Sequence, residues 1–142
     1  MPSDAVFKVA NLAQHVVQRA SFGKLGWKAA RMPVVELTTT GRRSGEPRTT
    51  FLTSPWREDD TIVVVASAGG NDHHPAWLLN LQADPAVQVK MSGGPRQAMH
   101  ARVATAEERA RLWPLLTAEF KHYAGYQRKT DREIPLVLLQ PV

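Results

Sequence analysis

The sequence of 142 residues predicts an α+β fold: a small, six-stranded, mostly antiparallel β-barrel with flanking helices. Strand-like segments follow one another through short turns, which is typical of hairpin connections. Three helical segments are interspersed among them, an arrangement that suits a barrel with helical covers better than a doubly wound sheet. No Gly-x-Gly-x-x-Gly motif follows a strand and no Walker motif is present, so nucleotide-binding α/β folds are poor candidates.

The composition indicates a globular chain that binds something anionic. Hydrophobic residues make up 43% of the chain and charged residues 22%, which allows one domain with a proper core. A net charge of +5 and a pI near 10.0 favour a phosphorylated small ligand, nucleic acid or an acidic membrane surface as partner. The chain has no cysteine, which excludes disulfides, thiolate metal sites and thiol nucleophiles. Redox chemistry would therefore need a bound cofactor.

Residues 1–32 read as an amphipathic helix followed by a linker, and residues 33–142 as the barrel domain. The apolar stripe of the helix is weak, so the helix either docks on the domain or touches lipid peripherally. Neither a signal peptide nor a membrane-spanning segment is recognisable. We therefore expect a cytoplasmic protein, with peripheral membrane association as the alternative.

The first two strands form a hairpin with a cationic tip. The first is predicted from Val34 to Thr40 and the second from Pro47 to about Trp56, with Gly41 and Gly45 bracketing the turn. Guanidinium groups, hydroxyls and turn amides gathered at one place suit a phosphate or a carboxylate, although a solvated basic turn has the same composition. The tip residues are Arg42, Arg43, Ser44, Arg48, Thr49 and Thr50.

The strand at 61–67 is apolar at successive positions, so we expect it to be buried on both faces and to form the centre of the sheet. A loop containing Gly69 and Gly70 follows and permits close approach of a flat ligand. His73 and His74 lack partners at metal-ligand spacing, so no metal site is expected. A helix at 76–83 comes next, with an asparagine, Asn80, able to reach back toward the loop.

Two further strands, at about 87–89 and 97–104, precede a helix that a Thr105–Glu108 capping box opens. Pro114 predicts a kink or a split in that helix. The aromatic segment 120–126, loosened by a glycine, fits either a core stripe or a mobile cover over a pocket. A last strand is expected at 134–140.

Several motifs together resemble the deazaflavin-dependent nitroreductase family of actinobacteria. In chain order they are Thr38-Thr-Thr-Gly-Arg-Arg-Ser-Gly-Glu-Pro-Arg-Thr, Val65-Ala-Ser-Ala-Gly-Gly, Pro75-Ala-Trp-Leu-Leu-Asn-Leu, Asp84-Pro-x-Val, Thr105-x-Glu-Glu-Arg, Trp113-Pro and Thr130-Asp-Arg-x-Ile-Pro. The resemblance implies a split β-barrel of the FMN-binding type that holds coenzyme F-420, an 8-hydroxy-5-deazaflavin. The phospholactyl and oligoglutamate tail of that cofactor is anionic, as the cationic hairpin requires.

The resemblance also implies the site residues. The cofactor tail would bind at Arg42, Arg43, Ser44, Arg48, Thr49 and Thr50, and the ring along Ala66, Ser67, Ala68, Gly69 and Gly70. Phe51, Pro75, Ala76, Trp77 and Asn80 would complete the cofactor pocket. The substrate side would be formed by Ser67, Thr53, Phe120, Tyr123 and Tyr126. Three departures from the family pattern stand out: Thr53 and Phe120 replace tyrosines, and Ala68 replaces a lysine.

The function implied is hydride transfer from C5 of the reduced cofactor to an electron-poor acceptor. Ser67 and Tyr123 are the candidates for orienting that acceptor, which we expect to be an activated alkene or a quinone, with nitro compounds incidental. An FMN-dependent oxidoreductase of the same barrel and a non-catalytic cofactor carrier are the alternatives. Nucleic-acid binding ranks below them because exposed stacking aromatics do not accompany the basic residues. The sequence does not decide the oligomeric state.

Overall fold

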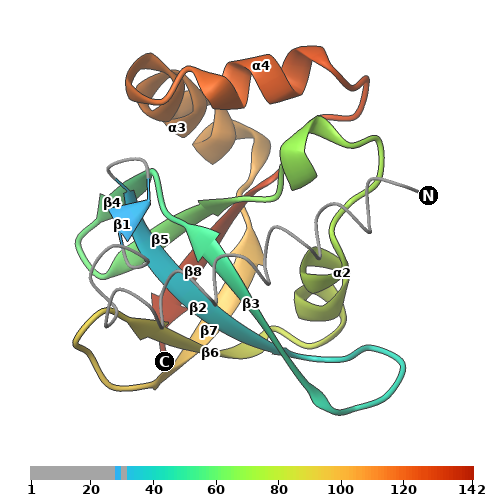
Figure 1. Ribbon diagram of the computed structural model, residues 1–142, viewed down its shortest axis with the longest axis vertical. Helices are drawn as coiled ribbons and strands as arrows, with labels where there is room; N and C mark the ends of the chain where they lie inside the picture. The colour runs from blue at the N-terminus through green and yellow to red at the C-terminus, as the bar shows by residue number, and fades with distance from the viewer. Residues whose placement is uncertain (1–27, 30–31) are drawn as a thin grey trace.

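One curled antiparallel sheet forms the body of the molecule, and the helices pack around it (Figure 1). The computed structural model describes residues 28–29 and 32–142, so the helix and linker expected at 1–32 lie almost wholly outside the described residues. In the described part the sheet has eight strands, in the order β1-β2-β6-β7-β8-β5-β4, with β3 paired to β2. They are β1 (Lys28–Ala29), β2 (Met32–Thr40), β3 (Pro47–Thr53), β4 (Trp56–Glu58), β5 (Thr61–Val65), β6 (Ala86–Met91), β7 (Gln97–Val103) and β8 (Leu136–Pro141).

All six predicted segments contain strands, but the described part of the sheet has two strands more than the six predicted. The predicted second strand is divided into β3 and β4 at Ser54, whose hydroxyl donates to the carbonyls of Val63 and Trp56 at 2.7 and 3.0 Å. Pro55 follows and has no N–H to continue the ladder. The other additional strand, β1, is two residues long and lies in the segment predicted as linker.

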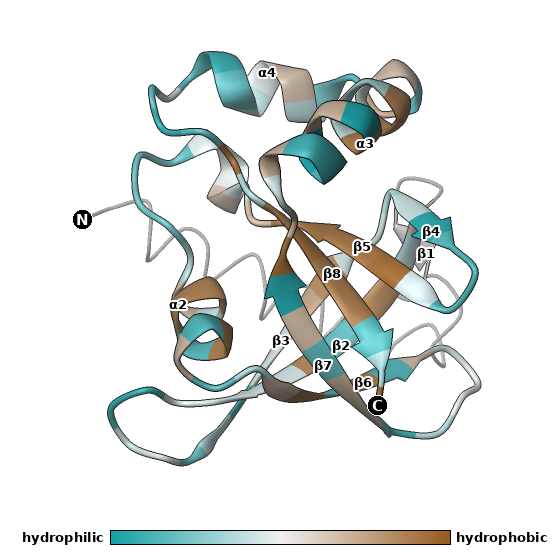
Figure 2. Ribbon diagram, turned by 180° about the vertical axis from the view of Figure 1, so that it is seen from behind, coloured by the Kyte–Doolittle hydropathy of each residue, from teal (hydrophilic) through white to brown (hydrophobic). Residues whose placement is uncertain are grey.

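The third predicted strand is β5, and it is buried on both faces as expected. It is not the centre of the sheet, however, since it lies between β8 and the short β4 near one edge. Ile62 and Val64 contribute to a core inside the curled sheet, and Val63 and Val65 to a second core on the opposite face. Figure 2 shows β5 and β8 as the most apolar strands of the sheet.

Helix α2 (Ala76–Ala83) closes the inner core with Trp77, Leu78 and Leu81. The second core lies under α3 (Ala106–Glu119) and α4 (His122–Arg128), which sit together at one end of the sheet (Figure 1). The capping box of α3 is confirmed, with Thr105 and Glu108 bonded to each other's backbone N–H groups. The predicted split at Pro114 is wrong, because α3 runs through that residue.

A one-turn 3-10 helix, η1 (Ala68–Gly70), follows β5 and contacts α4. The aromatic segment 120–126, for which a core stripe and a mobile cover were the alternatives, lies mostly in α4, with Gly125 inside the helix. Phe120 and Tyr123 are buried in the second core, which favours the core stripe. No helix in the described part of the chain is long and apolar enough to span a membrane.

Candidate functional site

The hairpin tip is a tight turn that depends on two glycines. Gly41 N–H donates to the Glu46 carbonyl and Gly45 N–H to the Gly41 carbonyl, both at 2.8 Å. Gly45 has a φ of +73°, a left-handed conformation that other residues adopt at a cost. A Cβ on Gly41 would lie 2.6 Å from the Ser44 hydroxyl and 3.2 Å from the Glu46 carbonyl oxygen, so a side chain there requires Ser44 to rotate and the turn to adjust. The turn is therefore fixed locally, as the sequence predicted.

Asn80 ties α2 to this hairpin. Its side-chain oxygen accepts from Arg42 N–H at 3.1 Å and from the Arg42 guanidinium at 3.3 Å. Its Nδ2 donates to Thr39 Oγ1 at 3.2 Å, and the residue is 5% exposed. The sequence predicted that this side chain reaches the loop after β5, and the structure shows it bonded to the hairpin instead. Its amide thus fixes the arginine-bearing turn against the helix.

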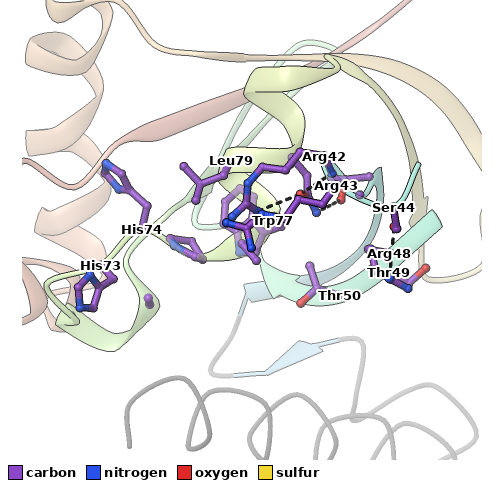
Figure 3. A pocket seen from close by; sticks show the side chains of 16 residues that line it. Arg42, Arg43, Ser44, Arg48, Thr49, Thr50, His73, His74, Trp77 and Leu79 are labelled. Carbon is purple, nitrogen blue, oxygen red and sulfur yellow. Dashed lines mark hydrogen bonds between the residues drawn. The ribbon is translucent and has the colours of Figure 1, made fainter. Parts of the chain in front are cut away.

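A cavity of about 700 Å³ lies between the hairpin, the loop after β5 and α2 (Figure 3). Figure 3 shows His73 and His74 at one end of the lining and Ser44, Arg48 and Thr49 at the other, with Trp77 between them. The lining residues are Thr39, Gly41, Arg42, Arg43, Ser44, Arg48, Thr49, Thr50, Ala68, His73, His74, Pro75, Ala76, Trp77, Leu79 and Asn80.

Most residues predicted to bind the cofactor come together in this cavity. Those brought to it are Arg42, Arg43, Ser44, Arg48, Thr49, Thr50, Ala68, Pro75, Ala76, Trp77 and Asn80. The predicted residues absent from the lining are Phe51, Ala66, Ser67, Gly69 and Gly70. The lining residues that the sequence analysis did not assign to the site are Thr39, Gly41, His73, His74 and Leu79.

Strand alternation explains two of these differences. Thr39 pairs with Arg48 in the β2–β3 register, and cross-strand partners share a face, so Thr39 joins the arginine side of the sheet. Phe51 follows Thr50 directly and points to the other face, where it is 4% exposed and packs against Val34. The period of two separates Thr50 from Phe51, although Thr49, which has the parity of Phe51, also lines the cavity next to the turn.

The cavity is cationic and contains polar groups without partners. Three arginines line it, and among the residues that the structure describes no carboxylate is in its lining. Arg48 donates to the Ser44 hydroxyl at 3.3 Å, which directs both toward the same end. Within the described residues, the Trp77 indole N–H and the Thr50 hydroxyl are buried and have no hydrogen-bond partner. An unpaired buried donor costs about 1–3 kcal/mol, so a ligand that accepts from it would be favoured.

The loop after β5 turns sharply. Ala68, Gly69 and Gly70 have φ values of +45°, +65° and +85°. A Cβ on Gly70 would come within 2.9 Å of the Tyr126 carbonyl oxygen, so α4 and the loop pack in direct contact. Ser67, at the start of this turn, is 8% exposed.

Of the residues predicted for the substrate side, Thr53, Tyr123 and Tyr126 lie together and outside the cavity lining. The Tyr123 hydroxyl lies 3.2 Å from Thr53 Oγ1 and donates to Met32 Sδ at 3.5 Å. Burial raises the pKa of Tyr123, so its phenol stays protonated near neutral pH. The Tyr126 ring packs edge-to-face on Tyr123, with ring centres 6.1 Å apart. Phe120 is buried in the same core as Tyr123 and also lines a smaller cavity of about 200 Å³.

Known proteins resemble this chain over most of its length. A family model described as F420H(2)-dependent quinone reductase matches residues 11–141. An F420H(2)-dependent quinone reductase of Mycobacterium tuberculosis is 35% identical over 127 residues, which is 87% of this chain and 84% of that protein.

Two solved structures resemble the chain over most of its length. A structure described as an F420-H2 dependent reductase (FDR-A) has a TM-score of 0.67 and 38% identity, and the match covers 76% of this chain and 94% of that one. A structure described as a domain-swapped dimer has a TM-score of 0.66 and 32% identity, covering 99% and 100% of the two chains.

Proposed function

The chain belongs to the F420H(2)-dependent quinone reductase family, and from that premise we propose that it reduces a quinone, or another electron-poor acceptor, with reduced coenzyme F-420. It is an oxidoreductase whose cofactor is the deazaflavin. The family model and its relatives name coenzyme F-420, and they give no support to FMN as the alternative.

The observation that carries the proposal is the cationic cavity. The three arginines that line the cavity match an anionic phosphate and glutamate tail, because charge-assisted bonds from arginine to such oxyanions are the strong ones. The unpartnered Trp77 N–H and Thr50 hydroxyl offer further polar contacts along the cavity. The residues present therefore fit the cofactor, with the tail at the arginines and the ring toward the histidine end.

When bound, the reduced deazaflavin supplies the hydride. The chain's own residues hold the tail, orient the ring and exclude water from its surroundings. We propose that Ser67, at the end of β5, lies on the ring side, in keeping with its position at the start of the loop that reaches the cavity through Ala68. Tyr123 and Thr53 are proposed to face the acceptor, and their hydroxyls, 3.2 Å apart, would act as a hydrogen-bonded pair.

Turnover separates this function from a non-catalytic cofactor carrier. Under anaerobic conditions the protein is mixed with reduced coenzyme F-420 and a soluble quinone, and the return of the oxidised deazaflavin fluorescence is followed. We expect enzyme-dependent oxidation with one quinol formed per cofactor oxidised. Tight binding with no oxidation of the cofactor by any quinone, activated alkene or nitro compound would identify a carrier and contradict the proposal.

Membrane contact is a proposal of lower rank. It rests on the amphipathic pattern of residues 1–32, which lie almost wholly outside the described part of the chain. The family's quinone acceptor is consistent with a reductase that works at a membrane surface, since many quinones are apolar. Co-sedimentation of the protein with anionic vesicles tests this point independently of turnover.

A further inference from the structure

An arginine outside the cavity lining holds the loop that forms one wall of the cavity. Arg132 follows α4 in the chain, and its guanidinium reaches the loop after β5. Its Nε donates to the Asn71 carbonyl at 2.8 Å, and its Nη2 to the Ser67 and Ala66 carbonyls at 2.9 and 3.2 Å. Its Nη1 lies 3.0 Å from His74 Nδ1.

These contacts use the whole guanidinium fork. All three nitrogens of Arg132 donate to acceptors on both sides of η1, which a lysine ammonium, a single point of charge, cannot reach together. Arg132 is itself held in place, because its backbone N–H donates to Thr130 Oγ1 at 3.3 Å. Burial lowers the pKa of Arg132 and the Asp72 charge partly offsets this, and an arginine remains protonated under either influence.

The contact with His74 fixes which ring nitrogen carries the proton. A guanidinium only donates, so His74 Nδ1 must accept, and the neutral imidazole then carries its hydrogen on Nε2. Burial and the Arg132 charge both lower the pKa of His74, which keeps the ring neutral at pH 7. His74 lines the cavity, so its Nε2–H is an N–H donor available there.

We propose that Arg132 is a positioning residue that holds the 66–74 loop against the bound cofactor ring and keeps His74 in the Nε2–H tautomer, as a donor to that ring. The inference rests on the proposed function, and it adds two residues to which that function assigned no role. Hydride transfer requires the donor and acceptor atoms to be held closely, so a loosened wall should lower the rate more than the affinity.

The first test uses the full-length protein without cofactor. Long-range proton–nitrogen spectra of histidine-labelled protein at pH 7 should show His74 as the Nε2–H tautomer in the wild type and as a tautomer mixture in Arg132→Lys. Exchange of the Gly70 and Asn71 amides, which bond to the Ser67 and Ala68 carbonyls, should be faster in the variant. A wild-type His74 that carries its proton on Nδ1 would overturn the proposal directly.

The second test measures the reaction of the loaded enzyme. In Arg132→Lys we expect kcat to fall about 10- to 100-fold, while the Kd for coenzyme F-420 changes much less because the tail contacts are intact. Arg128→Ala, which removes an exposed charge from α4, is the matched control and should leave both values unchanged. Wild-type kcat in Arg132→Lys would refute the positioning role.

The two tests distinguish a failure of the proposed function from a failure of the role assigned to Arg132. If the wild-type protein neither binds nor oxidises the deazaflavin, the proposed function is wrong, while the tautomer and the amide exchange still decide whether Arg132 organises the loop. His74→Phe removes the donor and leaves the carbonyl contacts of Arg132 in place. It should weaken cofactor binding without faster amide exchange, and unchanged binding would contradict the role of His74.

Discussion

Arg48 lies at the end of the cavity farthest from the histidines, where the cofactor tail is proposed to bind (Figure 3). Replacing it with alanine removes a charge-assisted contact worth about 1.5–3 kcal/mol, which is roughly a 10- to 150-fold rise in Kd. We expect that rise in a fluorescence titration with coenzyme F-420. Arg57→Ala is the control, because Arg57 lies on β4 and bonds to the Asp59 carbonyl. Equal affinities for wild type and Arg48→Ala would remove the hairpin from the site.

Local sequence signals were enough to predict this end of the site. Gly41 and Gly45 mark the turn, and the arginines and hydroxyls that surround them are close in sequence, so their convergence follows from the turn alone. Phe51 shows the limit of transferring a residue by resemblance without regard to its strand: alternation places its side chain on the opposite face from Thr50.

The loop after β5 packs so closely against α4 that a glycine is required at position 70. Gly69→Ala and Gly70→Ala both place an alanine at positive φ, which costs about 1–2 kcal/mol. Only Gly70→Ala also brings a Cβ to 2.9 Å from a backbone oxygen, that of Tyr126. We expect Gly70→Ala to lower the free energy of unfolding by about 1–3 kcal/mol more than Gly69→Ala. Equal losses in urea denaturation would show that the contact gives way at no cost.

Element boundaries were predicted where the signal is local. The Thr105–Glu108 capping box predicted the start of α3 from neighbouring residues, and the helix predicted at 76–83 has the bounds of α2. The Arg132 contacts could not be predicted in this way, because 61 residues separate Arg132 from Asn71 and no periodicity joins them. The motif Thr130-Asp-Arg-x-Ile-Pro marked the arginine as part of the resemblance without indicating what it touches.

The stability of the whole molecule should depend on pH through a carboxylate that joins sheet and helix. Arg102 of β7 donates to both oxygens of Glu108 at 2.7 and 2.8 Å, and this bond and the Thr105 backbone N–H lower the pKa of Glu108 from 4.5 to about 2. A lowered folded-state pKa gives stability that is present above pH 4.5 and lost as the pH falls toward 2.

Glu108→Gln tests this link. Glutamine keeps a capping-box oxygen but loses the charge, so we expect a loss of about 1–2 kcal/mol at pH 7 and a shallower decline of stability between pH 4.5 and 2. Glu107→Gln removes an exposed charge from the same helical turn and should keep the wild-type decline. The measurement is urea denaturation across this pH range. Parallel acid declines for Glu108→Gln and wild type would disprove the assignment.

The class of the fold was accessible from the sequence because hairpin turns and amphipathic helices are local patterns. The order of strands in the sheet was not, and β5 illustrates why. Its unbroken apolar run predicts burial on both faces, but helices α3 and α4 can bury the outer face of a strand near an edge as well as of a central one. Burial alone therefore does not locate a strand within a sheet.

Cofactor preference tests the central claim most directly, since the assignment of the cationic cavity to coenzyme F-420 and the proposed chemistry both depend on it. The full-length protein is titrated in parallel with coenzyme F-420 and with FMN, and fluorescence reports binding of each. We predict preferential binding of the deazaflavin, with the preference reduced in Arg48→Ala because FMN lacks the oligoglutamate tail. Tighter binding of FMN, or binding of neither cofactor, would contradict the account.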